Sequence, residues 1–384
     1  MSETENEEIT SFEDLKIDPD ILRGIFAYGF ENPSPIQKKG IVPFLSGRDI
    51  IAQAQSGTGK TATFCLGILG NIDRNSKTTQ ALVLAHTREL AIQINNVFSQ
   101  IGSFLKLDIN LSVKGVSVND NINQLKNSPH IVIGTPGRVY DMINKRALNT
   151  NTLKMFVLDE ADEMLSDGFV DQIKDIFRFM PGDVQVGLFS ATMPEVFFQI
   201  TEKFMRDPIK ILVKSEQLTL EGINQYYINV EKNSYKFDTL CELFSILTIN
   251  QSMIYCNNKK IVDDLTYKLR RENFTVSCIH SNMHSKEREE TMSEFRSGKT
   301  RVLISTDLLA RGIDVQQVSV VINYDVPNNI ESYLHRIGRS GRFGRKGVAI
   351  NFATFYDIDK IKKIEQYYGT IIDEMPADIH SIME

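Results

Sequence analysis

Residues 49–61 read Asp49-Ile-Ile-Ala-Gln-Ala-Gln-Ser-Gly-Thr-Gly-Lys-Thr61. The apolar start, Asp49–Gln53, predicts a β-strand, and a helical pattern begins at Lys60. A glycine-rich turn from a strand into a helix directs backbone N–H groups and the positive end of the helix dipole toward anionic oxygens. The stretch therefore predicts a phosphate-binding loop in an α/β protein. The alternative is a Gly/Ser loop that only turns the chain.

The spacing within Ala54–Thr61 matches the loops that bind nucleoside triphosphates. In such loops the lysine, here Lys60, reaches the β- and γ-phosphates, and the hydroxyl of Thr61 is a ligand of Mg²⁺. Ala54 stands where the general pattern has its first glycine. The residues predicted to hold the nucleotide here are Ser56, Gly57, Thr58, Gly59, Lys60 and Thr61.

A second motif, Asp159-Glu-Ala-Asp162, directly follows the apolar run Phe156–Leu158. Parallel sheets bind ligands at the carboxyl ends of their strands. We expect Asp159 to hold Mg²⁺, largely through water, and Glu160 to orient and deprotonate the attacking water. Asp162 is expected to contact Ser190-Ala-Thr192, which also follows a predicted strand. The alternative interpretation of this motif is an acidic helix cap.

The base of the nucleotide is expected to be adenine. GTPases read guanine with an Asn-Lys-x-Asp element, and the nearest string here, Asn258-Lys-Lys-Ile261, lacks the aspartate. A carboxamide can form two hydrogen bonds with the N7 and N6 edge of adenine, so Gln37 is a candidate reader. Tyr28 or Phe30 is a candidate stacking face. By residue type alone, an ordinary surface glutamine remains the alternative.

Short β-rich runs alternate with helical patterns along the chain, which predicts parallel sheets covered by helices on both faces. The polar stretch Lys214–Gly222 interrupts this alternation, and 384 residues suit two domains. We predict an acidic disordered tail at 1–11, domains at 12–213 and 224–384, and a linker at 214–223. The predicted strands are Asp49–Gln53, Ala81–Ala85, Asn110–Lys114, His130–Gly134, Met155–Leu158, Val186–Phe189 and Lys210–Val213, then Gln225–Val230, Ser252–Tyr255, Val276–Ile279, Val302–Ser305, Val318–Asn323 and Val348–Phe352.

Composition argues against several classes of protein. No apolar run approaches the ~18–20 residues that span a bilayer, and the acidic N-terminus lacks the features of a signal peptide. No Cys-x-x-Cys pair occurs, so neither a zinc site nor a disulfide framework is indicated, and the cysteines are expected to be small core residues. We therefore expect a cytosolic or nuclear protein without a membrane partner. The cysteines are Cys65, Cys241, Cys256 and Cys278.

The net charge of −6 alone argues against a nucleic-acid partner. However, the charge is unevenly distributed, because His335–Lys346 carries five Lys/Arg residues and no acid. A local basic surface can bind phosphates while the whole molecule stays acidic. The alternative for this stretch is a solvated loop.

In their order along the chain, these motifs resemble those of DEAD-box RNA helicases. Gly29–Gln37 resembles the Q motif of that family, with the isolated Phe12 upstream. The resemblance extends from Phe12 to the C-terminus, and Arg301–Gly347 looks most like the translation initiation factor 4A group and its nuclear paralogues. The other matching motifs are Ala54–Thr61, Thr87–Leu90, Thr135–Arg138, Asp159–Asp162, Ser190–Thr192, Ala310–Asp314 and His335–Arg342.

The resemblance implies two tandem RecA-like domains and an RNA-stimulated ATPase that uses ATP and Mg²⁺ to unwind short duplexes locally. It implies that Arg339 and Arg342 are arginine fingers on the γ-phosphate, each worth roughly 10³–10⁵ in rate. It assigns nucleotide contacts to Phe12, Phe30, Gln37, Gly312 and Asp314. It assigns coupling between the nucleotide and RNA sites to Asp162, Ser190, Thr192 and His335.

The resemblance also implies a single-stranded RNA or short duplex as partner, bound through sugars and phosphates without base readout. Three positions depart from the family pattern, His86, Val116 and Ser285, and all three are expected on the RNA side. We therefore expect hydrolysis to be intact, and either the affinity for RNA or its coupling to ATP to differ from the family pattern. The RNA contacts implied are Arg88, Gly115, Thr135, Gly137, Arg138, Asn257, Arg288 and Thr306.

The implied protein is a cytoplasmic monomer, with the nucleus as alternative, that acts in translation initiation with a scaffold protein of initiation-factor type. A different class of function is an ATP-gated RNA clamp or RNA-processing scaffold whose partners block turnover. An inactive scaffold is disfavoured because Lys60, Glu160, Arg339 and Arg342 are all present.

Overall fold

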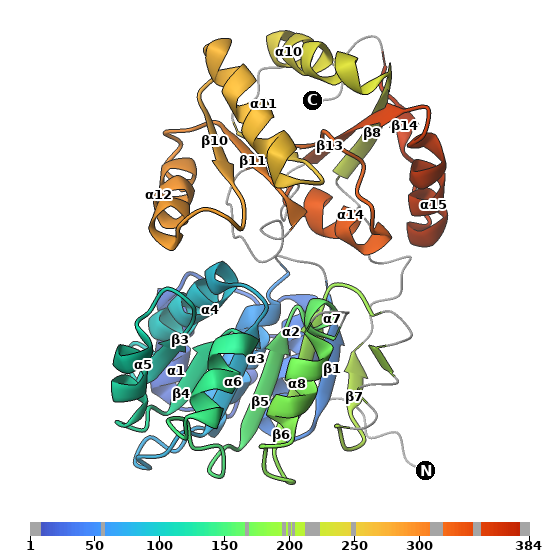
Figure 1. The fold of residues 1–384 in the computed structure, drawn as a ribbon. Helices are drawn as coiled ribbons and strands as arrows, with labels where there is room; N and C mark the ends of the chain where they lie inside the picture. Colours follow the sequence, from blue (N-terminus) through green and yellow to red (C-terminus); the bar gives the residue numbers. More distant parts are fainter. Residues whose placement is uncertain are drawn as a thin grey trace. The chain divides into compact units, whose positions relative to one another are not determined.

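The chain divides into two compact units, Met1–Val213 and Lys214–Glu384, and each is built on one seven-stranded sheet (Figure 1). The computed structural model describes residues 9–54, 58–165, 169–193, 197–198, 201, 204–211, 223–246, 251–307, 318–340 and 347–376. Within these ranges, no helix has both the length and the apolar character needed to cross a membrane.

The sheet of the first unit has the strand order β3-β4-β2-β5-β6-β1-β7, and every neighbouring pair is parallel. Its strands are β1 (Ile50–Gln53), β2 (Ala81–Ala85), β3 (Ile109–Ser112), β4 (Ile131–Gly134), β5 (Met155–Asp159), β6 (Gln185–Ser190) and β7 (Ile209–Ile211). Its helices are the 3₁₀ turn η1 (Phe12–Asp14), α1 (Pro19–Ala27), α2 (Pro35–Leu45), α3 (Lys60–Asn71), α4 (Arg88–Ile101), α5 (Val118–Leu125), α6 (Pro136–Asn144), α7 (Ala161–Met164) and α8 (Val170–Phe177).

The second unit repeats this design with the strand order β10-β11-β9-β12-β13-β8-β14, again all parallel. Its strands are β8 (Ile223–Glu231), β9 (Ser252–Tyr255), β10 (Val276–Ile279), β11 (Val302–Ser305), β12 (Val320–Asn323), β13 (Gly347–Thr354) and β14 (Asp373–Glu374). Its helices are the 3₁₀ turn η3 (Asn233–Tyr235), α10 (Lys236–Ile246), α11 (Lys259–Arg271), α12 (Ser285–Arg296), α14 (Ile330–Ile337) and α15 (Ile358–Tyr368).

The predicted fold class, an α/β protein with parallel sheets and helices on both faces, is confirmed. Each predicted strand is present within a few residues, whereas β14 was not predicted. That strand is two residues long and exposed, so the sequence has no buried apolar run that would predict it. Among the described residues, Ile9 is already buried in the core of the first unit, upstream of the predicted boundary at Phe12. Residues 214–222, most of the predicted linker, lie outside the described residues.

The inner strands β4, β2, β5, β6 and β1 are buried on both faces, as expected for a parallel sheet between helices. Along β2, Ala81, Val83 and Ala85 face one apolar cluster and Leu82 and Leu84 face the other. The first cluster is completed by residues of α1 to α4, and the second by residues of α5 to α8. The period of two along each strand therefore distributes the helices between the two faces.

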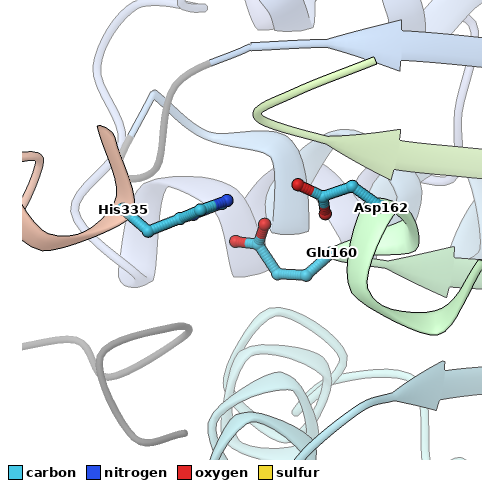
Figure 2. A group of neighbouring side chains, drawn as sticks. All are labelled: Glu160, Asp162 and His335. Atoms are coloured by element: carbon cyan, nitrogen blue, oxygen red, sulfur yellow. The ribbon is translucent and has the colours of Figure 1, made fainter. Parts of the chain in front are cut away.

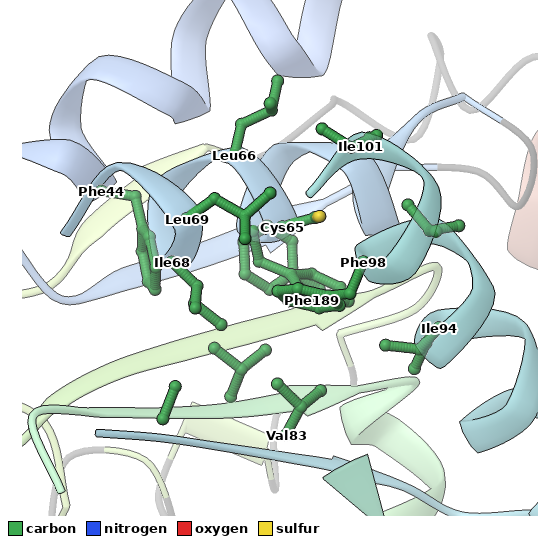
Figure 3. Close-up of a cluster of buried hydrophobic side chains, with 14 of the residues drawn as sticks. Phe44, Cys65, Leu66, Ile68, Leu69, Val83, Ile94, Phe98, Ile101 and Phe189 are labelled. Atoms are coloured by element: carbon green, nitrogen blue, oxygen red, sulfur yellow. The ribbon is translucent and has the colours of Figure 1, made fainter. Parts of the chain in front are cut away.

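Figure 3 shows part of the first cluster, in which α3 and α4 pack on the sheet through residues such as Phe98, Ile94 and Cys65. Burial raises the pKa of the Cys65 thiol well above its ordinary value, so this residue behaves as a small apolar side chain. Cys256 is also buried, in the core of the second unit, and Cys241 and Cys278 pack against the same core. The cysteines therefore act as core residues, as predicted.

One buried carboxylate connects three strands of the first unit. Asp49, which directly precedes β1, accepts hydrogen bonds from the backbone N–H groups of Val186 at 2.8 Å and Arg206 at 2.7 Å. Its own carbonyl accepts from the N–H of Ile209 at 2.8 Å, where β7 begins. One buried and one partly buried backbone donor thus depend on one side chain.

We expect Asp49→Ala to lower the free energy of unfolding of the first unit by about 2–4 kcal/mol, because the buried N–H of Val186 and the partly buried N–H of Arg206 would lose their acceptor. Calorimetric unfolding of the purified chain measures this loss. The matched control is Asp207→Asn, which removes the exposed charge that pairs with Arg48, keeps a residue that tolerates the positive φ of this position and should leave the transition unchanged. Equal transition temperatures for the two variants would contradict the assignment.

Candidate functional site

The predicted phosphate loop joins β1 to α3. Lys60 is the first residue of α3, and its buried Nζ lies 3.6 Å from Oε1 of Glu160. Gly59 has a φ of +102°, in the left-handed region that favours glycine. A Cβ there would also lie 2.5 Å from Nε2 of Gln37. The backbone conformation therefore favours a glycine at the start of this helix, and any side chain there would have to displace the amide of Gln37.

Gln37, the predicted adenine reader, contacts this same loop. It lies in the first turn of α2, where its Oε1 accepts a hydrogen bond from the N–H of Ser34 at 2.8 Å. Its Nε2 donates to the carbonyl of Gly59 at 3.5 Å. These bonds fix the orientation of the carboxamide and connect α2 to the phosphate loop. Adenine reading stays a prediction, and the structure adds a supporting role for this residue.

The aromatic residues near Gln37 form one cluster. The rings of Phe12 and Phe30 lie 6.1 Å apart with 28° between their planes, and those of Tyr28 and Phe30 lie 4.8 Å apart. Phe12 is fully buried, whereas Phe30 and Tyr28 keep part of their surface exposed. Phe12 therefore supports the cluster from the core, and the exposed parts of the other two rings are available for stacking.

The acidic motif lies where the sequence predicted it, at the carboxyl end of β5. Oδ2 of Asp159 lies 3.5 Å from Oγ1 of Thr61, and its Oδ1 accepts the N–H of Glu160 at 3.1 Å. Glu160 itself has φ 55° and ψ 54°, a left-handed conformation that costs a non-glycine residue about 1–3 kcal/mol. Such strain concentrates at functional sites, and here it directs the side chain that was predicted to be the general base.

The charges of this cluster do not balance. The pKa of Asp159 is raised to about 7, chiefly by burial and also by the neighbouring Glu160 carboxylate, while Lys60 opposes both effects. Two buried carboxylates thus share one ammonium group, so an additional cation would relieve the repulsion. Mg²⁺ prefers hard oxygen ligands, and the Thr61 hydroxyl and Asp159 carboxylate supply them. The residues present therefore fit a magnesium ion.

Asp162 and the segment that follows β6 make the predicted contact. The N–H of Asp162 donates to Oγ of Ser190 at 3.4 Å, and the hydroxyl of Thr192 donates to Oδ2 of Asp162. All three residues are buried. Figure 2 shows the carboxylates of Glu160 and Asp162, which come from the segment after β5, and also His335 from α14 of the second unit. The contact is confirmed, while the coupling role of these residues stays a prediction.

The residues predicted to bind RNA in the first unit gather at the carboxyl ends of β2, β3 and β4. Nε of Arg88 donates to the carbonyl of Lys114 at 2.9 Å, and Nη2 of Arg138 donates to the carbonyl of Val116 at 2.9 Å. Gly115, between these two carbonyls, has a φ of +102°. Two arginines therefore hold the backbone of one glycine turn. Thr135 and Gly137 lie at the start of α6, which also carries Arg138.

His86 lies at the end of the strand that neighbours the acidic motif. It follows β2, whose last residue Ala85 pairs in register with Asp159. The buried His86 is thus at the same strand ends as the acidic motif, and its place on the RNA side stays a prediction. The carbonyl of Val116 accepts a hydrogen bond from Arg138, and the position of Val116 on the RNA side also stays a prediction. Ser285 is the first residue of α12, the helix that also carries Arg288.

In the second unit, a fully buried arginine organises the strand ends. Arg336 of α14 donates to both carboxylate oxygens of Asp307, with Nη2 at 2.8 Å from Oδ2. Nη2 also donates to Oδ1 of Asn257 at 2.8 Å, and Nη1 donates to Oδ1 of Asn323 at 3.2 Å and to the carbonyl of Asp325. All five N–H donors of the guanidinium are therefore used.

This arginine network fixes two predicted RNA-binding positions. Asn257 follows β9, and its Nδ2 donates to the carbonyl of Val326 at 2.9 Å, so both ends of its amide are held. Thr306 follows β11 and directly precedes Asp307. Arg339, a predicted arginine finger, lies one turn after His335 and donates a hydrogen bond from Nε to the His335 carbonyl at 3.3 Å.

Five predicted site residues lie outside the described part of the chain. They are Ser56, Gly57, Gly312, Asp314 and Arg342.

Sequence reasoning missed the role of Arg336. It lies within the basic stretch His335–Lys346, and composition does not distinguish a buried arginine from one that faces a phosphate. A useful signal was present, because its partners Asp307, Asn323 and Asp325 stand at or just after the ends of buried strands. Polar residues at such positions are candidates for a shared site.

The string Asn258–Ile261, which lacks the aspartate of a guanine-binding element, has a structural role. Oδ1 of Asn258 caps α11 by accepting a hydrogen bond from the N–H of Ile261 at 3.0 Å.

Comparison with known proteins agrees with this geometry. Residues 34–200 match the DEAD/DEAH box helicase family and residues 235–344 match the helicase conserved C-terminal domain. A Debaryomyces hansenii protein, ATP-dependent RNA helicase eIF4A, is 57% identical over 374 residues, which covers 97% of this chain and 94% of that protein. Eukaryotic initiation factor 4A of Caenorhabditis elegans is 58% identical over 375 residues, covering 98% of this chain and 93% of that protein.

The fold has the same relatives. The structure of S. cerevisiae Dbp5 bound to RNA and ADP BeF3 matches with a TM-score of 0.90 and 36% sequence identity, covering 98% of this chain and 100% of that chain. The two parallel sheets with their covering helices are thus two RecA-like domains. The chain belongs to the DEAD-box family of RNA helicases and, within that family, resembles the eIF4A proteins over nearly its whole length.

Proposed function

We propose that this protein is an RNA-stimulated ATPase that uses ATP to unwind or remodel short RNA duplexes locally, and that it acts in translation initiation. The observation that carries the proposal is the buried cluster of Lys60, Asp159 and Glu160 at the ends of β1 and β5. Such a cluster suits phosphoryl transfer, which depends on positioned charge more than on covalent chemistry. The similarity to proteins named as eIF4A supports the role in initiation.

In this proposal each residue of the cluster has one task. Lys60 neutralises charge on the β- and γ-phosphates, and Glu160 orients the attacking water and accepts its proton. Thr61 and Asp159 would hold Mg²⁺, which neutralises phosphate charge when it is bound. Arg339 and Arg342 supply positive charge to the transition state as arginine fingers. Gln37 reads adenine, and Asp162, Ser190, Thr192 and His335 couple this site to RNA.

The RNA face follows from the glycine turn at 114–116. Backbone groups of Gly115, Thr135 and Gly137, with the side chains of Arg88 and Arg138, suit sugars and phosphates better than base edges. Binding should therefore be independent of sequence and should weaken steeply with salt. Asn257, Arg288 and Thr306 supply the contacts of the second unit.

The remaining parts of the proposal concern the cellular setting. Translation initiation takes place in the cytoplasm, so we place the protein there. We propose that it works as a monomer with a scaffold protein of initiation-factor type, in line with its eIF4A relatives. Light scattering of the purified chain checks the monomer.

The decisive experiment measures ATP turnover with and without single-stranded RNA for the unaltered protein and for Glu160→Gln. RNA is expected to stimulate the unaltered protein. Loss of the general base should lower turnover by about 10²–10⁴-fold while ATP and RNA still bind. Glu163→Gln, the same change three residues further along in α7, is the matched control and should turn over normally.

Two outcomes would contradict the proposal. Turnover that does not respond to RNA would argue against an RNA-dependent enzyme, and normal turnover of Glu160→Gln would remove that residue from catalysis. Turnover that a partner protein blocks, combined with very slow release of RNA while ATP is bound, would instead favour the RNA clamp.

The role of Gln37 is tested by two substitutions that separate its contacts. Gln37→Glu keeps the oxygen that accepts the Ser34 N–H, whereas Gln37→Ala removes both ends of the carboxamide. Both should lower the preference for ATP over GTP by about tenfold or more, because the N–H donor is lost in each. Both should also weaken binding of ATP and GTP alike, since each loses the Nε2 contact to the phosphate loop, and Gln37→Ala should weaken it more because the bond to Ser34 is lost as well. Unchanged ATP preference in both variants would exclude adenine reading.

The raised pKa of Asp159, about 7, predicts a pH dependence of metal binding. The folded protein without metal keeps this carboxyl protonated below pH 7, whereas an unfolded chain would ionise it near 3.8. Because Mg²⁺ binds the ionised form, Mg²⁺-dependent affinity for an ATP analogue should weaken about tenfold from pH 8 to pH 6. The control is the same titration with EDTA, where the change should be much smaller. Equal pH dependence with and without Mg²⁺ would contradict this prediction.

A further inference from the structure

A buried polar network lies at the carboxyl end of β3, next to the glycine turn at 114–116. Asn110, Ser112 and Asn121 are buried, and the network ends at the exposed side chain of Gln124. Asn110 and Ser112 are on β3, and Asn121 and Gln124 are on α5. Burying an amide costs free energy unless its hydrogen bonds are made, so each buried donor and acceptor of this network needs a partner.

The bonds of this network fix the orientation of Asn121. Its Nδ2 donates to Oδ1 of Asn110 at 3.2 Å and to Oγ of Ser112 at 3.1 Å. The Ser112 hydroxyl donates to the same Oδ1 at 2.8 Å, and Nδ2 of Asn110 donates to Oε1 of Gln124 at 3.0 Å. Both N–H donors of Asn121 are thus used inside the network. Its carbonyl oxygen is left to point outward.

The side-chain carbonyl oxygen of Asn121 lies next to the guanidinium group of Arg138. Nη1 of Arg138 lies 3.5 Å from Oδ1 of Asn121, while Nη2 of the same guanidinium donates to the carbonyl of Val116 at 2.9 Å. The guanidinium therefore lies between the buried network on one side and the glycine turn on the other. A planar fork held at two points has a defined orientation.

We infer that Asn121 is a positioning residue for RNA binding, which it serves by orienting Arg138 and, through it, the glycine turn at 114–116. This inference rests on the proposed function, since it requires that this turn faces RNA. Asn121 is too deeply buried to touch a ligand itself. Its effect on RNA must therefore pass through Arg138, and that route can be tested.

A double-mutant cycle isolates the route. The proteins are the unaltered chain, Asn121→Leu, Arg138→Ala and the double variant, and the measurement is the Kd for a single-stranded RNA oligonucleotide in the presence of a non-hydrolysable ATP analogue. Asn121→Leu alone should weaken RNA binding by about three- to tenfold, as expected for one lost hydrogen bond to a charged group. In the Arg138→Ala background the same substitution should have almost no further effect.

A second readout separates positioning from general damage. The KM for ATP measured without RNA should change by less than about twofold in Asn121→Leu, because the network does not touch the phosphate loop, and distant sites behave independently. The matched control is Gln124→Leu, which removes the exposed end of the network and has no contact with Arg138 in the described structure. Its RNA affinity should equal that of the unaltered protein. Should Asn121→Leu fail to fold, Asn121→Ala takes its place in the same cycle.

The outcomes distinguish the two proposals. Multiplicative losses in the double variant would show that Asn121 does not act through Arg138, and would overturn this inference while the RNA face stands. Normal RNA affinity of Asn121→Leu beside a weakened Arg138→Ala would overturn it in the same way. If Arg138→Ala itself binds RNA normally, the proposed RNA face fails and the inference fails with it.

Discussion

The position of β5 between β2 and β6 is the constraint on which the nucleotide site depends. All three strands are parallel, so their carboxyl ends meet at one edge of the sheet, with Asp159 paired in register with Ala85 on one side and Phe189 on the other. β1 adds to this edge through the pairing of Gln53 with Ser190. The register is set by apolar side chains buried on both faces of the sheet. A slip by one residue would move each side chain of the slipped strand to the opposite face. The acidic motif is therefore held in place by the core.

Both units extend this logic with buried polar groups at the strand ends. Arg336 holds the ends of three strands of the second sheet, and Asn121 connects the end of β3 to Arg138 in the first. Fully satisfied polar networks of this kind favour one arrangement over its neighbours, because any other arrangement leaves a donor or acceptor unpaired. The loops that are proposed to contact RNA are thus held by hydrogen bonds to these buried residues. Their geometry depends on residues that do not reach the ligand.

Most of the fold and much of the nucleotide site could be predicted from the sequence. Continuous apolar runs mark β2, β5 and β9, and the phosphate loop and acidic motif have fixed spacing within the chain. Three features could not be predicted. The partners of Arg336 come from strand ends far apart in the sequence, the proximity of His86 to the acidic motif follows from register between two strands, and the amide orientation of Asn121 depends on packing in three dimensions. Each is a tertiary property that no local pattern carries.

The all-parallel pairing also shapes how the chain is made. β1 has as its neighbours β6 and β7, which are encoded far downstream. At about 5–20 residues per second, the ribosome exposes β1 many seconds before either partner strand emerges. During that interval the N–H and C=O groups of β1 have no partner strand, so β1 can pair wrongly with another chain. Newborn copies of this protein should therefore depend on chaperones until Ser190 has left the exit tunnel.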